Sequence, residues 1–518
     1  MLTPSQKAKL EELWGRGLMK FDPHCPRLSV LVDEAVGVGL NMNQIKNYVK
    51  KARLETGMCS WEQEDVDREV LIALTLDELR VRRGISLQDE VDILTWTSSQ
   101  RTGLEPRAAS PSPPQGPLSG APPLSLRPGG QVLAVGENDC GQLALVDEHE
   151  IVKSEDDLDY EGRLLPTPVA LPAGKIIVDV AAGALHSAFL TSEGEVWTCG
   201  NNDEGEVARP TAGDVDGHRV TSTCLDASGL VAAAVSCGDS FTAILDTRGR
   251  LFWAGQLRDS NGVYYNIGPR LQEVPGWWAP VTKISTGGNH LAVLVANTIA
   301  CCGAPDLGQL GRIRARRALK RSSKETALTL SPWTTASDFV DVCCGQNTTI
   351  GITAAGDIFG CGANNQCQLA LEGPQIIWTT TRIEALSQRQ LVQVAMGDTH
   401  GIALSSTGAV LCWGDRWEGQ LGDNRACGTP SATPLAVHGL PNDIRQVSAG
   451  PRQSYCWTSL SQAYAWGSGV SNQLCVGKEV DRKEAPVPMV GLPARPILKI
   501  SGGGQHVLVL VEPPAPKC

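Results

Sequence analysis

The sequence of 518 residues contains no apolar run near the roughly 20 residues that a helix needs to cross a bilayer. Its start, MLTPSQKAKLEELW, is polar and lacks the apolar core of a signal peptide, so we expect neither secretion nor membrane association. Although 17 cysteines are present, no two have the C-x-x-C spacing of zinc ribbons and redox motifs. We therefore expect reduced cysteines that pack as small hydrophobic residues in an intracellular core.

Motifs for cofactor chemistry are also missing. The chain has no phosphate-binding loop, metal-ligand spacing or dinucleotide fingerprint, so we expect no metal and no cofactor. The net charge of -11 argues against a chain coated along its length by nucleic acid, although local basic patches remain. Hydrophobic residues (42%), glycine (55 residues) and proline (32 residues) are abundant. This composition predicts a folded protein with a sizeable core and many turns.

A stretch rich in proline, serine and glycine at 101–130 divides the chain. Because such a segment buries too little surface to offset chain entropy, we predict an extended linker. Before it, 1–58 and 59–100 are rich in helix-forming residues. After it, 131–512 consists of short β-like runs broken by Gly, Asn and Asp.

Two sequence signatures alternate through 131–512, and each occurs seven times. The first is an apolar run that ends in Gly, followed by a turn and a short Gln-Leu-type segment, as in VLAVGENDCGQLAL from Val132. The second is G-x-x-H, or a substitute for His, followed by an apolar strand, as in GALHSAFL from Gly183. Turns such as TSEGEV and DTRGRL indicate hairpins. Successive glycines of the first signature are 48 to 64 residues apart by subtraction of their numbers.

A period of about 50 residues with several short strands is typical of a propeller blade. We predict an all-β seven-bladed propeller over 131–512, preceded by a small all-α domain. The region starts with the first signature and ends with the apolar strand GGQHVLVLVE, so one blade must combine both ends of the region. Such a blade closes the ring and leaves only short sheet edges.

The repeated pattern G-x-x-H-T-x-x-L, a glycine hairpin and WG-x-N-x-x-G-Q-L-G resembles the regulator of chromosome condensation family over nearly all of 131–512. The third occurrence of the first signature departs from this pattern and reads AGQLRDSNGVYYNIG. It resembles the β-wedge of the family's founding member, an exchange factor for the small GTPase Ran. The resemblance implies a wedge that displaces GDP by conformational means, without covalent catalysis. The matching residues are Arg258, Asp259, Ser260, Asn261, Gly262 and Val263.

The resemblance also implies a GTPase-binding face built from acidic and histidine side chains of the G-x-x-H loops and their neighbours. The corresponding residues are Asp139, Asp239, Asn289, His290, His400 and His506. The histidines have an alternative role, which is to bond the backbone across the central channel. Asn289 and Thr399 stand where the family has Asp and His, and these departures favour a propeller that binds partners without nucleotide exchange.

A basic segment, GRIRARRALKRSSK, follows the fourth first-signature repeat. In the family the matching loop docks on the acidic patch of histones, so the resemblance implies a chromatin contact. Guanidinium groups suit such a surface because they bind carboxylates in pairs of hydrogen bonds. A nuclear-import signal and a solvated charge run are the alternatives. The candidate residues are Arg312, Arg314, Arg316, Arg317, Lys320 and Arg321.

Residues 1–58 resemble a divergent homeodomain, with QIKNYVKKAR in the place of the recognition helix. We expect its basic side chains to contact DNA phosphates, and a protein-binding three-helix module is the alternative. Residues 59–100 predict further amphipathic helices. The candidate DNA-binding residues are Lys46, Asn47, Lys50, Lys51 and Arg53.

Together these patterns predict a nuclear, chromatin-associated exchange factor for a Ran-like small GTPase, with histones and DNA as further partners. The first alternative is a propeller scaffold without exchange activity that is tethered to DNA by its helical module. An enzyme that uses a pocket in the channel ranks last, because no catalytic triad motif is present.

Overall fold

The computed structural model of the chain describes residues 127–145, 162–211, 220–222, 230–312, 327–333, 338–425 and 428–514. The predicted helical domain at 1–58, its five DNA-binding candidates and the segment 59–100 lie outside these residues and stay predictions. The last residues of the predicted linker belong to the propeller, because Gly130 forms a β-bridge with Ile177. Among the described residues, no helix is long and apolar enough to cross a membrane.

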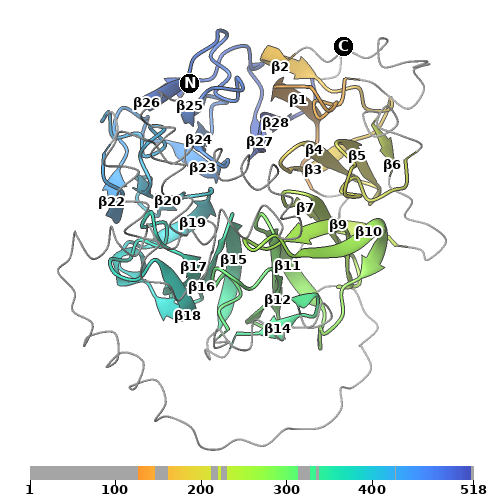
Figure 1. Ribbon diagram of the computed structural model, residues 1–518. Coiled ribbons are helices and arrows are strands. Elements are labelled where there is room, and N and C mark those ends of the chain that lie inside the picture. Colours follow the sequence, from red (N-terminus) through yellow and green to blue (C-terminus); the bar gives the residue numbers. More distant parts are fainter. Residues whose placement is uncertain are drawn as a thin grey trace, which may run out of the picture. The chain divides into compact units, whose positions relative to one another are not determined.

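The described strands form seven antiparallel sheets of four strands each, arranged as blades around a central channel (Figure 1). This confirms the predicted all-β seven-bladed propeller. Six blades use consecutive strands: β3 (Ile177–Ala182), β4 (His186–Thr191), β5 (Val196–Gly200) and β6 (Thr221–Ser222); β7 (Ala232–Cys237), β8 (Phe241–Asp246), β9 (Leu251–Arg258) and β10 (Tyr264–Glu273); β11 (Val281–Thr286), β12 (His290–Val295), β13 (Thr298–Gly303) and β14 (Ser331–Pro332); β15 (Phe339–Gly345), β16 (Thr348–Thr353), β17 (Ile358–Ala363) and β18 (Ile376–Arg382); β19 (Leu391–Met396), β20 (His400–Ser405), β21 (Val410–Gly414) and β22 (Ser431–Ala436); and β23 (Ile444–Ala449), β24 (Gln453–Thr458), β25 (Ala463–Ser468) and β26 (Arg482–Pro488).

The remaining blade joins both ends of the propeller, as its sequence order predicts. Its order is β2 (Arg163–Pro168), β1 (Gln131–Gly136), β28 (His506–Val511) and β27 (Ile497–Gly502). All six residues of β1 pair with β28, from Gln131 opposite Val511 to Gly136 opposite His506. The ring is therefore held closed by a full strand pairing between segments more than 350 residues apart. Figure 1 shows β1 beside β28.

The second strand of every blade is buried along its whole length, as in HSAFLT of β4 and HVLVLV of β28. These strands are apolar on both faces because each blade packs between two neighbours. The inner strands instead combine buried positions with partly exposed ones, as in IVDVAA of β3. Burial on both faces explains why the second strands give continuous apolar runs in the sequence.

The seven glycines of the first signature have one structural reason. Their φ angles lie between +99° and +123°, a region that other residues rarely adopt. At Gly255 a Cβ atom would also lie 2.3 Å from the carbonyl oxygen of Ser240. The repeat therefore requires glycine where the third strand of each blade meets the start of the second strand.

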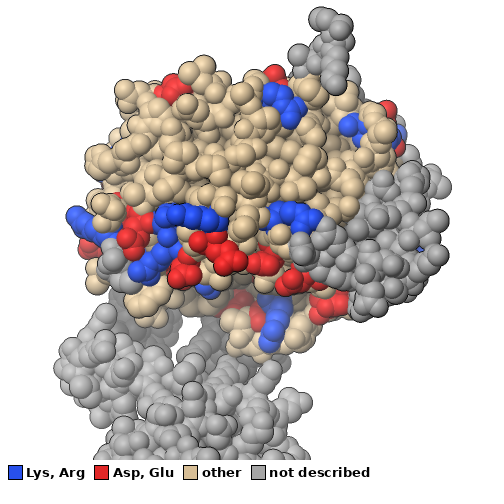
Figure 2. Space-filling view, turned by 90° about the horizontal axis from the view of Figure 1, so that it is seen from above, with Lys and Arg blue, Asp and Glu red and all other residues tan. Residues whose placement is uncertain are grey.

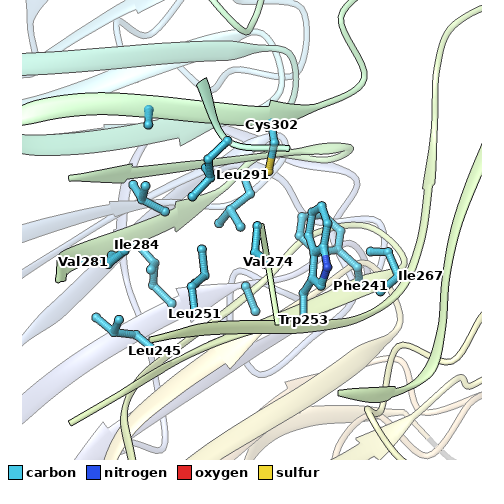
Figure 3. Packing of buried hydrophobic residues seen from close by; sticks show 14 of the residues in the cluster. Phe241, Leu245, Leu251, Trp253, Ile267, Val274, Val281, Ile284, Leu291 and Cys302 are labelled. Carbon is cyan, nitrogen blue, oxygen red and sulfur yellow. The ribbon is translucent and has the colours of Figure 1, made fainter. Parts of the chain in front are cut away.

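The hydrophobic core is divided into clusters between adjacent blades. The cluster between the β7–β10 and β11–β14 blades contains Phe241 and Trp253, whose rings meet edge to face at 6.4 Å (Figure 3). Leu257, Tyr265 and Ile267 belong to the same cluster, although they lie near the end of the β9–β10 hairpin. That hairpin is thus anchored in the inter-blade core.

Candidate functional site

One end of the channel is ringed by the seven loops that join first and second strands. Neighbouring loops are joined by backbone hydrogen bonds, from Asp239 N to Gly288 O at 2.9 Å and from Gly288 N to Gln346 O at 3.0 Å. The inner strands enclose a channel cavity of about 760 Å³, which Asp239 and Asp398 also line. Burial raises the pKa of both carboxyls, that of Asp398 to about 6 with a further contribution from Asp239.

At this end the β9–β10 hairpin extends further than the corresponding hairpins. In the closing, β3–β6, β11–β14 and β19–β22 blades the third strand stops at the signature glycine, whereas β9 continues from Gly255 to Arg258. Arg258 pairs with Tyr264 of β10, and residues 259–263 form the tip. We call Arg258–Val263 the wedge. Val263 and Tyr264 are 49% and 53% exposed, so the tip presents apolar surface beside polar groups.

Asp259 shapes the wedge from inside. Its backbone N–H donates to Val263 O at 3.0 Å, and its carboxylate accepts the backbone N–H groups of Asn261 and Val263, each at 2.9 Å. The hydroxyl of Tyr265 donates to the other carboxylate oxygen at 3.3 Å, and burial followed by the charge of Asp259 raises the pKa of Tyr265 to about 12. Asp259 is therefore the internal support of the wedge, and the outward groups are Arg258, Ser260, Asn261 and Val263.

The structure brings two of the predicted face residues to the wedge. Asn289 accepts the backbone N–H of Arg258 at 2.6 Å and donates to the Asp239 carboxylate at 3.1 Å. Gln346, which sequence reasoning missed, donates to the same carboxylate at 2.6 Å. Asp139 is exposed in the loop after β1, two blades away from β7–β10.

The histidines of the G-x-x-H loops are fully buried between blades, together with His186. Each ring Nε2 contacts a hydroxyl of the next blade. That hydroxyl in turn donates to a backbone carbonyl of the histidine's own blade. Because the hydroxyl hydrogen is used in this way, Nε2 must be the donor to the hydroxyl oxygen. The four clasps are His186–Thr242–Glu206 O, His290–Thr349–Gln309 O, His400–Ser454–Gln420 O and His506–Ser187–Gln142 O, with Nε2-to-hydroxyl distances of 2.8 to 3.0 Å.

This geometry favours the structural alternative for the histidines. His290, His400 and His506 are fully buried in this structure, and their predicted contact with a GTPase stays a prediction. Burial lowers the pKa of His186 to about 4, which keeps the ring neutral. The invariant glycine of the motif also follows, because a Cβ at Gly183 would lie 2.2 Å from the His186 ring.

The hydroxyl partners are the second set of residues that sequence reasoning missed. The signal was present, because each histidine faces Ser or Thr at the second position of the next blade's second strand. In three blades another residue stands at the histidine position, and the facing position of the next blade then has no hydroxyl. The pairs are Phe241 with Leu291, Thr348 with Gly401, and Gln453 with Val507. In two of these blades an aromatic side chain donates to the turn carbonyl instead. Trp413 Nε1 of the next blade donates to Gln368 O at 2.9 Å, and Tyr455 OH donates to Gln473 O of its own blade at 3.3 Å.

Of the basic segment, the structure describes only Arg312, which donates to Cys301 O at 2.9 Å. Arg314, Arg316, Arg317, Lys320 and Arg321 lie outside the described residues. Figure 2 shows that Lys and Arg alternate with Asp and Glu along a band of the rim, without a broad area of one sign on the visible described surface. Shape at the wedge, rather than charge on this rim, distinguishes a candidate binding surface.

Comparison with known proteins agrees with this geometry. The RCC1-like domain family model matches residues 131–509. The chain is 31% identical to the regulator of chromosome condensation of Xenopus laevis, covering 74% of this chain and 90% of the relative. It is 30% identical to the Homo sapiens protein, covering 74% and 91% respectively. The crystal structure of Prp20p from Saccharomyces cerevisiae has the same fold, with a TM-score of 0.66 at 19% identity over 76% of this chain and 93% of that chain. This chain therefore belongs to the RCC1-like domain family.

Proposed function

We propose that the chain is a guanine-nucleotide exchange factor for a Ran-like small GTPase, and that the wedge promotes GDP release. The observation that carries this proposal is the β9–β10 hairpin, which extends past its blade with an ordered tip and exposed Val263 and Tyr264. It lies at the same end of the blade as Asp239 and the channel mouth, where a partner can contact both.

The mechanism is an exchange of binding energy. A small GTPase holds its nucleotide through a phosphate-binding loop, a lysine and Mg²⁺. A wedge that binds the nucleotide-free form more tightly than the filled form weakens nucleotide binding by the same factor. No general base or nucleophile is needed, so the protein acts without covalent catalysis. A tip already ordered by Asp259 lowers the entropic cost of forming the complex.

The relatives support a GTPase and histones as partners. Prp20p was crystallised in a study of its binding to Gsp1p and histones. We extend both partner classes to this chain and propose a nuclear, chromatin-associated location. The histone contact is assigned to the basic segment from Arg312 to Arg321, and a DNA contact is assigned to the N-terminal region. For the latter, affinity for duplex DNA should fall as salt rises if Lys46, Lys50 and Lys51 contact phosphates.

The test is release of fluorescent GDP from purified Ran by the full chain. The wedge variant joins Arg258 to Tyr264 by Asn-Gly, because these two residues already pair across the hairpin and Asn-Gly forms a tight turn. We expect the full chain to accelerate release and the variant to lose at least about tenfold of that acceleration, equivalent to about 1.4 kcal/mol. Trp278→Ala, in the half-exposed loop between β10 and β11 at the other end of the blade, is the matched control and should exchange normally.

A scaffold that binds a partner on this face without exchange is the second candidate function. It is favoured by the burial of His290, His400 and His506, which removes three expected side chains from the contact surface. Binding of Ran without accelerated GDP release would select this candidate, and acceleration that survives wedge replacement would contradict the proposed role of the wedge.

A further inference from the structure

The inner edge of β9 continues beyond the strand that pairs with it. β8 begins at Phe241, opposite Gly255, so the part of β9 that follows has no strand on this side. In an isolated hairpin such an edge would be solvated and mobile, because two strands alone are marginally stable in water. The wedge therefore needs some other partner to keep a fixed direction.

The structure supplies that partner one amide at a time. The backbone N–H groups of alternate residues along one strand edge point the same way. Gln256 N donates to Ser240 O at 2.8 Å, which uses the last backbone acceptor of the blade itself. The next two amides of the series then donate to side chains of the neighbouring β11–β14 blade. Arg258 N donates to Asn289 Oδ1 at 2.6 Å, and Ser260 N donates to Asp306 Oδ2 at 2.7 Å.

We propose that Asn289 and Asp306 are positioning residues that together form a brace. The brace holds the wedge in one orientation, so that the wedge is already ordered when it meets a GTPase. This inference rests on the exchange function proposed above. The Asp306 carboxylate also accepts the hydroxyl of Ser260, so the tip is held by two donors at one oxygen. Hydrogen bonds to an ionised acceptor are stronger than those between neutral groups, which suits a single contact that must hold a projecting tip.

The identity of residue 289 fits the brace. An asparagine can accept from Arg258 N and donate to the Asp239 carboxylate at the same time, and it does both here. An aspartate could accept from Arg258 N, but it would face Asp239 with a second carboxylate and no donor. Gln346 donates to the same Asp239 oxygen, so the brace connects the wedge to the channel mouth across three blades.

Pre-organisation has a kinetic signature that distinguishes it from a general loss of stability. We assign docking of the GTPase to the loops that join the first and second strands, which do not depend on the tip, and we assign action in the nucleotide-free complex to the wedge. A disordered tip must be ordered at that step, so its cost lowers kcat more than it raises KM. Loss of a charge-assisted hydrogen bond is expected to lower kcat by about tenfold or more.

The experiment measures Ran-GDP exchange by the full chain with Asp306→Ala, Asp306→Asn and the control Asp443→Ala. Asp443 also binds a hydroxyl, that of Ser459 at 3.2 Å, but at the opposite end of a different blade. We expect Asp306→Ala to lose kcat with KM changed less than about twofold. Asp306→Asn should recover most of the rate, because the amide oxygen still accepts Ser260 N, and the control should behave as the wild type.

Amide hydrogen exchange of the same proteins tests the brace without the GTPase. Peptides covering 256–264 should be protected in the wild type and in Asp306→Asn, and should exchange much faster in Asp306→Ala. Equal exchange rates in all three proteins overturn the brace. If the wild type is active and Asp306→Ala has the same kcat, the kinetic role of the brace is overturned. If the wild type does not accelerate GDP release from Ran, the proposed function is overturned and the kinetic role of the brace with it.

Discussion

Lowering the pH from 7 to 5 should destabilise the propeller steeply because four buried histidines cannot accept a proton in the folded state. Burial lowers the pKa from 6.5 to about 4 in His186, His290 and His400, and to about 3 in His506. No Nδ1 atom of these rings has a hydrogen-bond partner within the described residues. A proton added there would therefore create a buried and unpaired charge.

The sign and size follow from proton linkage. Below pH 6.5 the unfolded histidines bind protons that the folded ones refuse until about pH 4, so stability is full above 6.5 and falls with falling pH. At about 1.4 kcal/mol per pH unit, each histidine costs about 2 kcal/mol between pH 7 and pH 5, so the four together cost several kcal/mol. Three carboxyls act in the opposite sense because burial raises their pKa: Asp239, Glu206 and Asp398. Asp398, with a pKa of about 6, offsets about 1 kcal/mol. A net loss of several kcal/mol is a large part of the whole stability of many domains.

The assay is urea unfolding of the full chain followed by tryptophan fluorescence at pH values between 7 and 5. The informative variant is His506→Gln, since Gln453 occupies the same position in the β23–β26 blade. Its side-chain amide can still donate to Ser187 but does not titrate, so the loss of stability between pH 7 and pH 5 should shrink by about 2 kcal/mol, the share of one histidine. A midpoint that is constant between pH 7 and 5, or the same pH dependence in both proteins, would refute the reasoning.

Three further predictions concern the carbonyl donors, a signature glycine and the basic segment. Urea unfolding should show Trp413→Phe to be about 1–3 kcal/mol more destabilising than Trp466→Phe, because the carbonyl that Trp466 serves also accepts the Ser454 hydroxyl. By the same assay, Gly255→Ala should cost about 3 kcal/mol or more, since its φ of +111° and its lack of space both exclude a Cβ. Nucleosome pull-down should weaken when three arginines become Glu: Arg314, Arg316 and Arg317.

The ring could be predicted from the sequence because its signals are local and repeated. The signature glycines indicate a positive φ angle, and the apolar runs indicate strands that are buried on both faces. The order of signatures at the two ends of 131–512 predicts the closing blade. Gly194 and Gly249 have positive φ in the hairpins that TSEGEV and DTRGRL predict. Apart from the closing blade, which compares the two ends of 131–512, none of these inferences needs knowledge of a distant residue.

The role of the histidines could not be read from one motif because their partners lie one repeat away. His186 and Thr242 are 56 residues apart, His290 and Thr349 are 59 apart, and the pair that closes the ring is separated by 319. The G-x-x-H motif alone is compatible with a histidine on the binding surface and with a histidine buried between blades. The pairing of each histidine with a hydroxyl one blade later would have decided it.

The wedge shows the same limit. Its six residues could be located because a tight-turn sequence interrupts a repeat, but the brace could not. Asp306 lies in GAPDLGQL, which the sequence presents as an ordinary repeat turn, and Asn289 differs from the family residue in a way that suggests loss of function. The structure gives that difference a positive reason, since an amide serves Arg258 and Asp239 together and an ionised carboxylate cannot.

The wedge blade also differs in how it joins its neighbour. In five of the other six blades the Gln-type turn offers a backbone carbonyl that accepts a buried hydroxyl or indole of the next blade, as Gln309 O accepts Thr349. In the β23–β26 blade the carbonyl of Gln473 accepts the Tyr455 hydroxyl of the same blade. In the β7–β10 blade the wedge occupies the place of that turn, so a hydroxyl on the next blade would have no carbonyl to serve. Phe241 and Leu291 fill this interface with apolar contact instead. The polar link between the two blades is displaced to the surface, where Asn289 and Asp306 bind the wedge itself, so the connection that other blades use for stability is used here to orient the tip.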